Sequence, residues 1–304
     1  MYGGSGATAS GPPFTYVTLP AGKRSVVEAI HKGDSSVQLW RRLPGDFATP
    51  MVAMDGSQTG LSADGTTLVL VKNGRRYPPR KTELLVLYAQ GLQTADQVTL
   101  PGFHSVDAIS PDGRWVYLIH YTKPLRDPNA YEVRAYDLKR HRMDPKPVID
   151  PREPDEKMTG QPLTRVMSAD DRWAYTLYRA DDPFVHALDT VNRTAVCIDL
   201  AALKGVDLTQ SVKLTLSGTT LHVGNLAAID TRTHKLLAPT TPKPKPRPAP
   251  AKHDGGRSPW PLAAIGVAAL ALVALIARRR RSVHDVVDLH VTVDHPEQEP
   301  SLRK

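Results

Sequence analysis

Three aspartates lie at equivalent points of similar short sequences, and their carboxylates are the first candidates for acid–base chemistry. Asp64 lies in Leu-Ser-Ala-Asp-Gly, Asp112 in Ile-Ser-Pro-Asp-Gly and Asp170 in Met-Ser-Ala-Asp-Asp. Two carboxylates act on one bond only when they flank it closely, whereas equivalent residues of successive repeats are expected about 10 to 20 Å apart. The spacing therefore favours a structural role in turns over joint catalysis.

The histidines show no spacing typical of a metal site, because neither His-x-x-x-His nor His-Glu-x-x-His occurs. If distant strands meet at a central channel, His120 and His186 are the candidates to meet there. The chain also has no Gly-x-Ser-x-Gly, no P-loop and no Gly-x-Gly-x-x-Gly. We therefore predict no catalytic residue, no metal and no cofactor, and we lean away from an enzyme.

The Ser-x-Asp-Gly sequences are typical of tight turns. Serine and aspartate side chains bond nearby backbone N–H groups, and glycine accepts the positive φ that such a turn requires. The predicted turn residues are Ser62, Asp64, Gly65, Ser110, Asp112, Gly113, Ser168 and Asp170. In the third turn Asp171 replaces the glycine, and a fourth, degraded turn at Ser217 has lost the aspartate.

Each turn precedes an apolar strand, and a second strand ending near Asp-Leu or Asp-Thr follows. The serines are separated by 110 − 62 = 48, 168 − 110 = 58 and 217 − 168 = 49 residues. Short runs rich in Val, Leu, Tyr and Thr alternate with turn residues from Phe14 onward, which predicts strands. The predicted strands are 14–19, 25–30, 37–42, 67–71, 83–88, 115–121, 132–137, 173–178, 184–188, 194–199, 213–216 and 226–229.

A four-stranded antiparallel sheet repeated every 40 to 50 residues or so is a propeller blade. Such blades pack face to face, so the middle strands are buried on both faces. Continuous apolar runs such as Leu-Val-Leu-Val at 68–71 and Val-Tyr-Leu-Ile at 116–119 fit this burial. We predict an all-β propeller of about five four-stranded blades, the first lacking its first strand.

The segment Ser110 to Tyr117, Ser-Pro-Asp-Gly-Arg-Trp-Val-Tyr, followed by Tyr-Asp-Leu at 136–138, resembles the YVTN and TolB-type repeats. The resemblance covers about residues 14 to 238. It implies a WD-repeat-like β-propeller, of which many are exported bacterial proteins, and it implies no particular activity.

Charge is distributed unevenly along the 304 residues, whose net charge is +8. Residues 238 to 281 hold nine basic residues and one acidic one, which leaves 39 − 9 = 30 basic and 31 − 1 = 30 acidic residues elsewhere. The excess therefore belongs to one segment, and we expect no nucleic-acid partner. Cys197 is the only cysteine, so no intrachain disulfide is possible.

That segment predicts a stalk and a membrane anchor. Residues 239–259 contain seven prolines, which favours a stiff polyproline II rod of roughly 60 Å. Residues 260–277 carry no charge, and eighteen helical residues span about 27 Å, close to a bilayer core. Trp260 suits the membrane interface, and Arg278, Arg279, Arg280 and Arg281 suit a cytoplasmic edge.

The predicted organisation is a flexible N-terminus (1–13), a propeller (14–238), a stalk (239–259), a transmembrane helix (260–277) and a short charged tail (278–304). We expect a single-pass protein of the cell membrane whose propeller faces outward and binds a protein or small ligand, with lipid contacting residues 260–277. No signal peptide is visible, so we expect one, with a first strand, upstream of Met1. The alternatives are a lactonase-like propeller hydrolase at the membrane and a tail-anchored cytosolic scaffold.

Overall fold

The computed structural model describes residues 6–74, 76–127, 129–155, 158–208 and 212–238. By its contacts the chain divides into two units, Met1–Thr241 and Pro242–Lys304, and the described residues all belong to the first. The predicted stalk, transmembrane helix and charged tail, with Trp260 and Arg278 to Arg281, lie outside the described residues. The fold is therefore that of the predicted propeller region.

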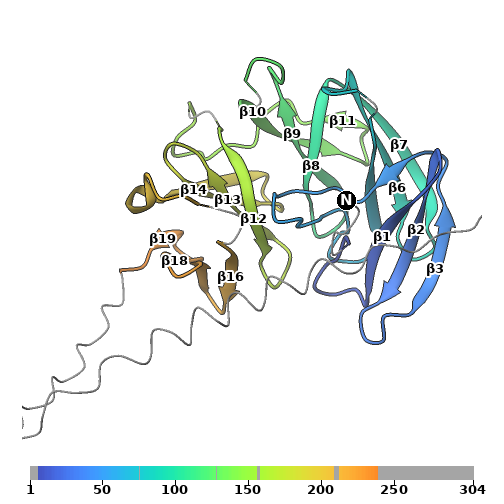
Figure 1. Cartoon of the computed structure of the whole chain (residues 1–304), viewed down its shortest axis with the longest axis horizontal. Coiled ribbons are helices and arrows are strands. Elements are labelled where there is room, and N and C mark those ends of the chain that lie inside the picture. Colours follow the sequence, from blue (N-terminus) through green and yellow to red (C-terminus); the bar gives the residue numbers. More distant parts are fainter. Residues whose placement is uncertain (1–5, 75, 128, 156–157, 209–211, 239–304) are drawn as a thin grey trace, which may run out of the picture. The chain divides into compact units, whose positions relative to one another are not determined.

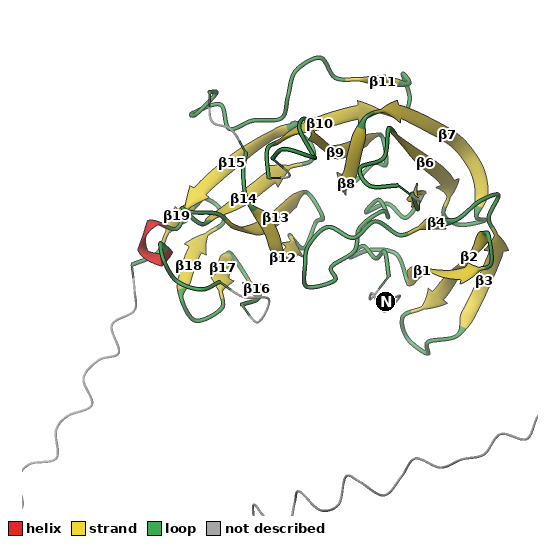
Figure 2. Ribbon diagram, turned by 45° about the horizontal axis from the view of Figure 1, so that its top comes forward, coloured by secondary structure: helices red, strands yellow, loops and turns green. Residues whose placement is uncertain are grey.

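The described chain forms five antiparallel sheets, numbered here in chain order, and in each sheet the strands follow one another as in the sequence (Figures 1 and 2). Sheet 1 has three strands, β1 (Phe14–Ala21), β2 (Arg24–His31) and β3 (Val37–Arg42). Sheet 2 has β4 (Phe47–Ala48), β5 (Thr67–Lys72), β6 (Lys81–Tyr88) and β7 (Gln93–Pro101). Sheet 3 has β8 (Phe103–Ile109), β9 (Trp115–Tyr121), β10 (Tyr131–Asp137) and β11 (Arg142–Met143).

Sheet 4 has β12 (Gln161–Met167), β13 (Trp173–Arg179), β14 (Phe184–Asp189) and β15 (Thr194–Asp199). Sheet 5 has β16 (Leu214–Ser217), β17 (Thr220–Val223), β18 (Ala227–Asp230) and β19 (Lys235–Leu236). Between them lies one turn of 3₁₀ helix, Ala201–Leu203. The prediction of an all-β fold of about five sheets is confirmed.

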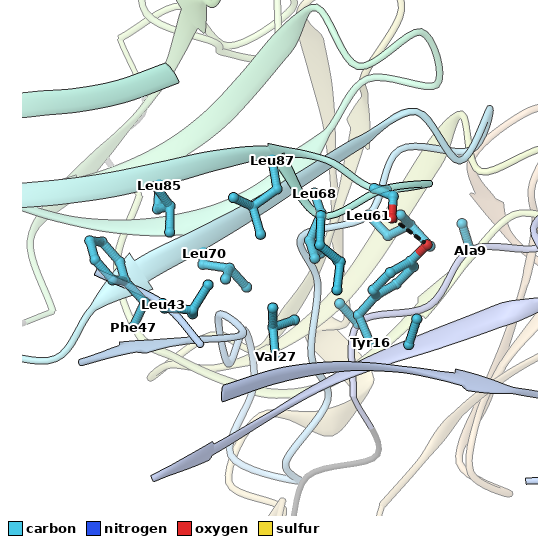
Figure 3. Close-up of a cluster of buried hydrophobic side chains, with 14 residues drawn as sticks. Ala9, Tyr16, Val27, Leu43, Phe47, Leu61, Leu68, Leu70, Leu85 and Leu87 are labelled. Atoms are coloured by element: carbon cyan, nitrogen blue, oxygen red, sulfur yellow. Dashed lines mark hydrogen bonds between the residues drawn. The ribbon is translucent and has the colours of Figure 1, made fainter. Parts of the chain in front are cut away.

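Consecutive sheets pack face to face through apolar side chains. Between sheets 1 and 2, for example, Val27 and Leu43 lie in one buried cluster with Leu68, Leu70 and Leu87 (Figure 3). Further clusters join sheets 2 and 3, sheets 3 and 4, and sheets 4 and 5. Because each middle sheet is covered on both faces, its second strand contains an unbroken run of buried residues, namely Leu68 to Leu70 in β5 and Val116 to Ile119 in β9. Repeated antiparallel sheets packed in this way are the architecture of a β-propeller.

The N-terminal segment departs from the flexible terminus expected for residues 1–13. Ala7 pairs with Tyr16 of β1 through two backbone hydrogen bonds of 2.8 and 2.9 Å, and both Ala7 and Ala9 are buried. The segment beside Ala7 thus takes the place of a first strand in sheet 1. Ala7 and Ala9 belong to the same buried apolar cluster as Tyr16, and this packing holds the segment against sheet 1.

The hairpin between the last two strands closes in the same way in all five sheets. A residue with φ between 51° and 58° occupies the same point of every loop, namely Ser35, Leu92, His141, Arg193 and His234. The regularity marks five copies of one unit, including the three-stranded sheet 1. Because this loop joins β2 to β3 in sheet 1, these two strands correspond to the third and fourth strands of the other sheets, and β1 corresponds to their second strand.

Candidate functional site

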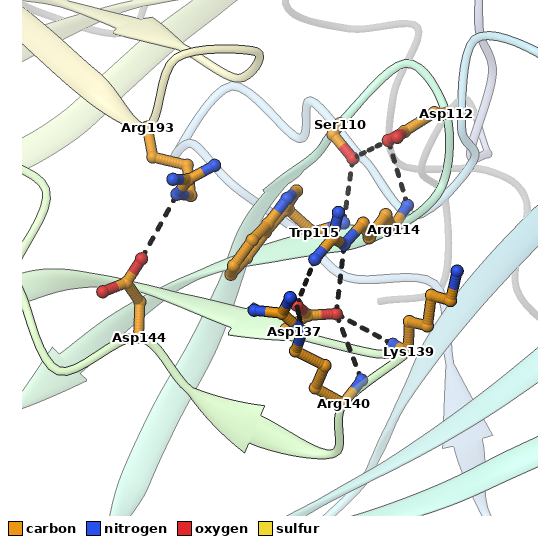
Figure 4. Close-up of polar contacts among 9 residues, drawn as sticks. All are labelled: Ser110, Asp112, Arg114, Trp115, Asp137, Lys139, Arg140, Asp144 and Arg193. Carbon is orange, nitrogen blue, oxygen red and sulfur yellow. Dashed lines mark hydrogen bonds and ion pairs between the residues drawn. The ribbon is translucent and has the colours of Figure 1, made fainter.

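The Ser-Pro-Asp-Gly sequence of sheet 3 forms a compact turn (Figure 4). The Ser110 hydroxyl donates to Asp112 Oδ1 at 2.5 Å and accepts from the Trp115 N–H at 2.9 Å. Asp112 also accepts from the Arg114 N–H at 3.1 Å. The same arrangement recurs in the turns formed by Ser62, Asp64 and Gly65 and by Ser168 and Asp170. Gly65 and Gly113 have φ of 68° and 69°.

These bonds keep the carboxylates of Asp64 and Asp170 in their charged form. The Ser168 hydroxyl is the main cause that lowers the pKa of Asp170 below its usual value. For Asp64, burial raises the pKa, but the hydroxyl of Ser62 and the N–H of Thr66 outweigh it and the pKa is lowered. A carboxylate with a lowered pKa and satisfied oxygens is a poor proton donor at neutral pH.

A second polar contact links each of two turns to the end of the third strand. Arg114 forms a two-point ion pair with the buried Asp137, with distances of 2.7 and 3.3 Å. Arg172 does the same with Asp189, at 2.6 and 3.1 Å. Each pair joins the turn between the first two strands to the end of the third strand of the same sheet, so these charges serve the fold.

Trp115 lies between two guanidinium groups, with Arg114 at 5.1 Å and Arg193 of the next sheet at 4.4 Å from its ring centre (Figure 4). Arg193 is held by Asp144 at 3.2 Å. Trp173 of sheet 4 repeats the contact with Arg172 at 5.5 Å and His234 of sheet 5 at 4.6 Å. Because it recurs between successive sheets, this contact belongs to the packing of neighbours.

The structure places the two candidate channel histidines in different settings. The His120 ring stacks on His104, with ring centres 4.5 Å apart, whereas His186 meets the edge of Tyr178 at 6.3 Å. Burial lowers the pKa of both His104 and His186 to about 4, so both are neutral at physiological pH. Among the described residues no group of three or more His, Cys, Asp or Glu side chains is placed to hold a metal ion.

A buried ion pair joins sheets 3 and 4. Arg165 of β12 pairs with the Asp107 carboxylate of β8, donates to the Asp107 backbone carbonyl, and donates through Nε to Thr176 at 2.9 Å. The two side chains are 3% and 1% exposed. Sequence reasoning missed this pair, although both residues precede the turn serine by three positions, 110 − 107 and 168 − 165. An alignment of the repeats on their serines would have found it.

A cavity of about 740 Å³ lies at the strand ends opposite the Ser-x-Asp-Gly turns. It is formed by the β1–β2 turn, the chain before β4, the loop between β5 and β6, and the start of β8. Its volume lies within the roughly 300 to 1,000 Å³ typical of small-molecule sites. We therefore take it as the candidate binding site.

Basic and aromatic side chains line this cavity. Its cations are Lys23, Lys72, Arg76 and Lys81, and its acids are Asp46 and Glu83, which leaves an excess of two positive charges. Its aromatic side chains are Tyr77, Phe103 and His104. The sequence signal was the stretch 72–81, KNGRRYPPRK, a charged and proline-rich connection between two apolar strands. Sequence reasoning missed it because no known motif contains it.

The fold defines the class of this chain as an all-β protein of propeller-type repeats. No family model and no curated protein sequence matches it. Similar solved structures include the hydrazine synthase of Kuenenia stuttgartiensis, with a TM-score of 0.44 and 13% identity over 74% of this chain and 67% of that chain. They also include TolB from Acinetobacter baumannii (0.40, 13%, 72% and 49%) and the Dos1 propeller (0.44, 13%, 76% and 56%).

These likenesses are remote, and nothing about activity follows from them. The chain spans about half the length of the TolB and Dos1 chains. In the part of the chain that the structure describes, no helix is long and apolar enough to cross a membrane.

Proposed function

We propose that this chain is a membrane-tethered β-propeller of the YVTN/TolB type that binds a ligand on its outward side. The observation that carries the binding role is the cavity between the β1–β2 turn, the β5–β6 loop and the start of β8. Loops on a rigid sheet scaffold are where binding residues concentrate. The turn carboxylates are held by hydrogen bonds within the fold, which favours binding over catalysis.

The tether rests on the sequence of residues 239–281. A proline-rich, cationic stalk followed by an uncharged stretch of eighteen residues and four arginines is the pattern of a single-pass anchor. Protease treatment of intact cells that make the full chain should release a fragment that ends within the stalk. A domain that resists the protease in intact cells and is digested only in inverted vesicles would place it on the other side.

The binding role is tested inside the same cells by a method that captures any bound molecule, whatever its chemistry. A photo-crosslinking amino acid replaces Tyr77 in the cavity, and in a matched variant it replaces Tyr88, at the other end of β6. Both side chains are well exposed, at 68% and 61%. We expect a crosslinked adduct at position 77 and none at position 88. Equal crosslinking at both positions, or none at either, would count against a binding role for this cavity.

A further inference from the structure

Two cations at the cavity mouth have no acidic partner among the residues that the structure describes. Lys72 and Lys81 share Glu83, at 3.1 and 3.3 Å. Lys23 and Arg76 are exposed and form no ion pair within the described residues. Unpaired cations at the rim of a concave site attract and orient an anionic group.

The polar wall of the cavity is held in place by its own hydrogen bonds. The Asn73 side chain donates to Asp46 Oδ1 at 2.9 Å, and the Asn73 N–H donates to the Asp46 carbonyl at 2.8 Å. The buried Thr82 hydroxyl donates to the Gly102 carbonyl at 3.1 Å and accepts from the His104 N–H at 2.8 Å. A ligand would therefore meet a preorganised polar surface and need little ordering of the protein.

The exposed ring of Tyr77 lines the same cavity and is held in place by contacts with other rings. The Tyr77 ring is 68% exposed, and it packs edge-on against Phe103 with ring centres 5.5 Å apart. Phe103 in turn stacks on Tyr121 at 4.5 Å, at the end of β9. A large exposed ring supported in this way offers a flat apolar platform at a low cost in side-chain entropy.

We propose that this cavity binds an acidic glycan, with a sugar ring packed on Tyr77 and its carboxylate or phosphate group near Lys23 and Arg76. The inference rests on the proposed binding function and names its ligand class. A sugar ring has an apolar C–H face for the aromatic platform, hydroxyls for the polar wall and, when acidic, a charge for the rim. An extended nucleic acid fits less well, because outside residues 238–281 basic and acidic residues balance at 30 each.

The test measures binding by calorimetry, with the full chain in detergent micelles at low salt. The probes are trigalacturonic acid, the neutral trisaccharide of galactose, and a phosphorylated mannotriose. We expect both acidic probes to bind at least tenfold more tightly than the neutral one, and salt to weaken them. The ratio of the two acidic affinities reports whether carboxylate or phosphate is preferred.

Matched variants assign the binding to this cavity. Tyr77→Ala should weaken the acidic probe about two- to tenfold through loss of ring packing. Lys23→Ala and Arg76→Ala should each weaken it about two- to fivefold and reduce its salt dependence. The controls Tyr88→Ala and Lys139→Ala, with exposed side chains at the opposite strand ends, should leave the affinity unchanged.

The glycan proposal is overturned if acidic and neutral probes bind equally, if none binds at millimolar concentration, or if uridine monophosphate binds more tightly than any sugar. It is also overturned if the cavity variants and the controls behave alike. The proposed binding function survives such a result whenever the crosslinker at position 77 still captures a ligand, for example a protein.

Discussion

Asp171 illustrates how one residue can replace glycine in a repeated turn and gain a second task. At φ of 53° it has nearly the backbone of Gly65 and Gly113 in the equivalent turns, a conformation that aspartate tolerates better than most residues. Its carboxylate accepts the Ser10 N–H at 2.6 Å and the Ser10 hydroxyl at 3.1 Å. The substitution was visible in the sequence. Its partner was not, because nothing local predicts a contact across 161 residues.

The two buried histidines make stability depend on pH. Burial lowers the pKa of His104 and His186 to about 4, from 6.5 in the unfolded chain. Between pH 4 and 6.5 the unfolded chain therefore binds more protons than the folded one. The contribution to the unfolding free energy is fully present above pH 6.5 and is lost as the pH falls toward 4, by at most about 1.4 kcal/mol per pH unit and histidine.

We expect denaturant unfolding of the full chain to show this slope and His186→Gln to reduce it. We compare the slope of the unfolding free energy against pH, and not the free energy itself, because removing a buried ring also lowers stability at every pH. Thr215→Ala, at an exposed side chain that does not titrate, serves as the control and should keep the slope. An unchanged slope in His186→Gln would mean that His186 is protonated in the folded protein at these pH values.

At the scale of elements, the sequence predicted the middle strands far better than the strands on either side. The second strands β5, β9 and β13 were predicted within a residue or two, because burial on both faces leaves continuous apolar runs. The first strands β8 and β12 were missed. They carry Asp107 and Arg165, which look solvent-exposed in the sequence and are buried only because they pair with each other.

The outer strand β7 was missed because it has no continuous apolar run. Its exposed and buried residues vary as expected for an edge strand, and most of its side chains are polar or small. The candidate cavity could not be predicted from the sequence either. It depends on four separate segments that the packing of sheets 1, 2 and 3 brings together, and each segment by itself reads as an ordinary loop.

Tyrosines at the third position of a second strand tie neighbouring sheets together. The Tyr16 hydroxyl of sheet 1 donates to the Ala89 carbonyl of sheet 2 at 3.1 Å, and the Tyr117 hydroxyl of sheet 3 donates to the Thr190 carbonyl of sheet 4 at 2.7 Å (Figure 3 for Tyr16). Burial raises the pKa of the Tyr117 hydroxyl, so it remains a protonated donor. Each bond joins a buried phenol to the residue that follows a third strand.

Tyr117→Phe should lower the unfolding free energy by about 0.5 to 1.5 kcal/mol, because it removes one buried hydrogen bond and leaves a carbonyl unpaired. Chemical denaturation of the full chain measures the change. Tyr88→Phe, at an exposed tyrosine, should change it by less than about 0.5 kcal/mol. Equal effects in the two variants would show that the hydroxyl of Tyr117 contributes no net stability.

At the scale of the whole domain, the two terminal sheets present different faces. The face of sheet 1 turned away from sheet 2 is mostly apolar, and its cross-strand rows are Leu19–Val26–Arg42, Val17–Glu28–Trp40 and Thr15–Ile30–Val37. The corresponding face of sheet 5 is mostly polar, with rows Thr215–His222–Ala228 and Ser217–Thr220–Asp230–Lys235. Among the described residues no apolar cluster joins sheet 5 to sheet 1. Sheet 5 is thus built as a solvated end, and sheet 1 is not.

The apolar face of sheet 1 should govern how readily the domain self-associates. Trp40 is 64% exposed at its centre row and Val37 is 49% exposed beside it, so Trp40→Glu removes the largest apolar side chain from the patch. We expect light scattering of the full chain in detergent to show less association, with the unfolding free energy changed by less than about 0.5 kcal/mol. Thr215→Glu on sheet 5 is the control and should leave association unchanged. If Trp40→Glu instead destabilises the fold by several kcal/mol, Trp40 is buried in the working protein, and sheet 1 is covered there by structure outside the described residues.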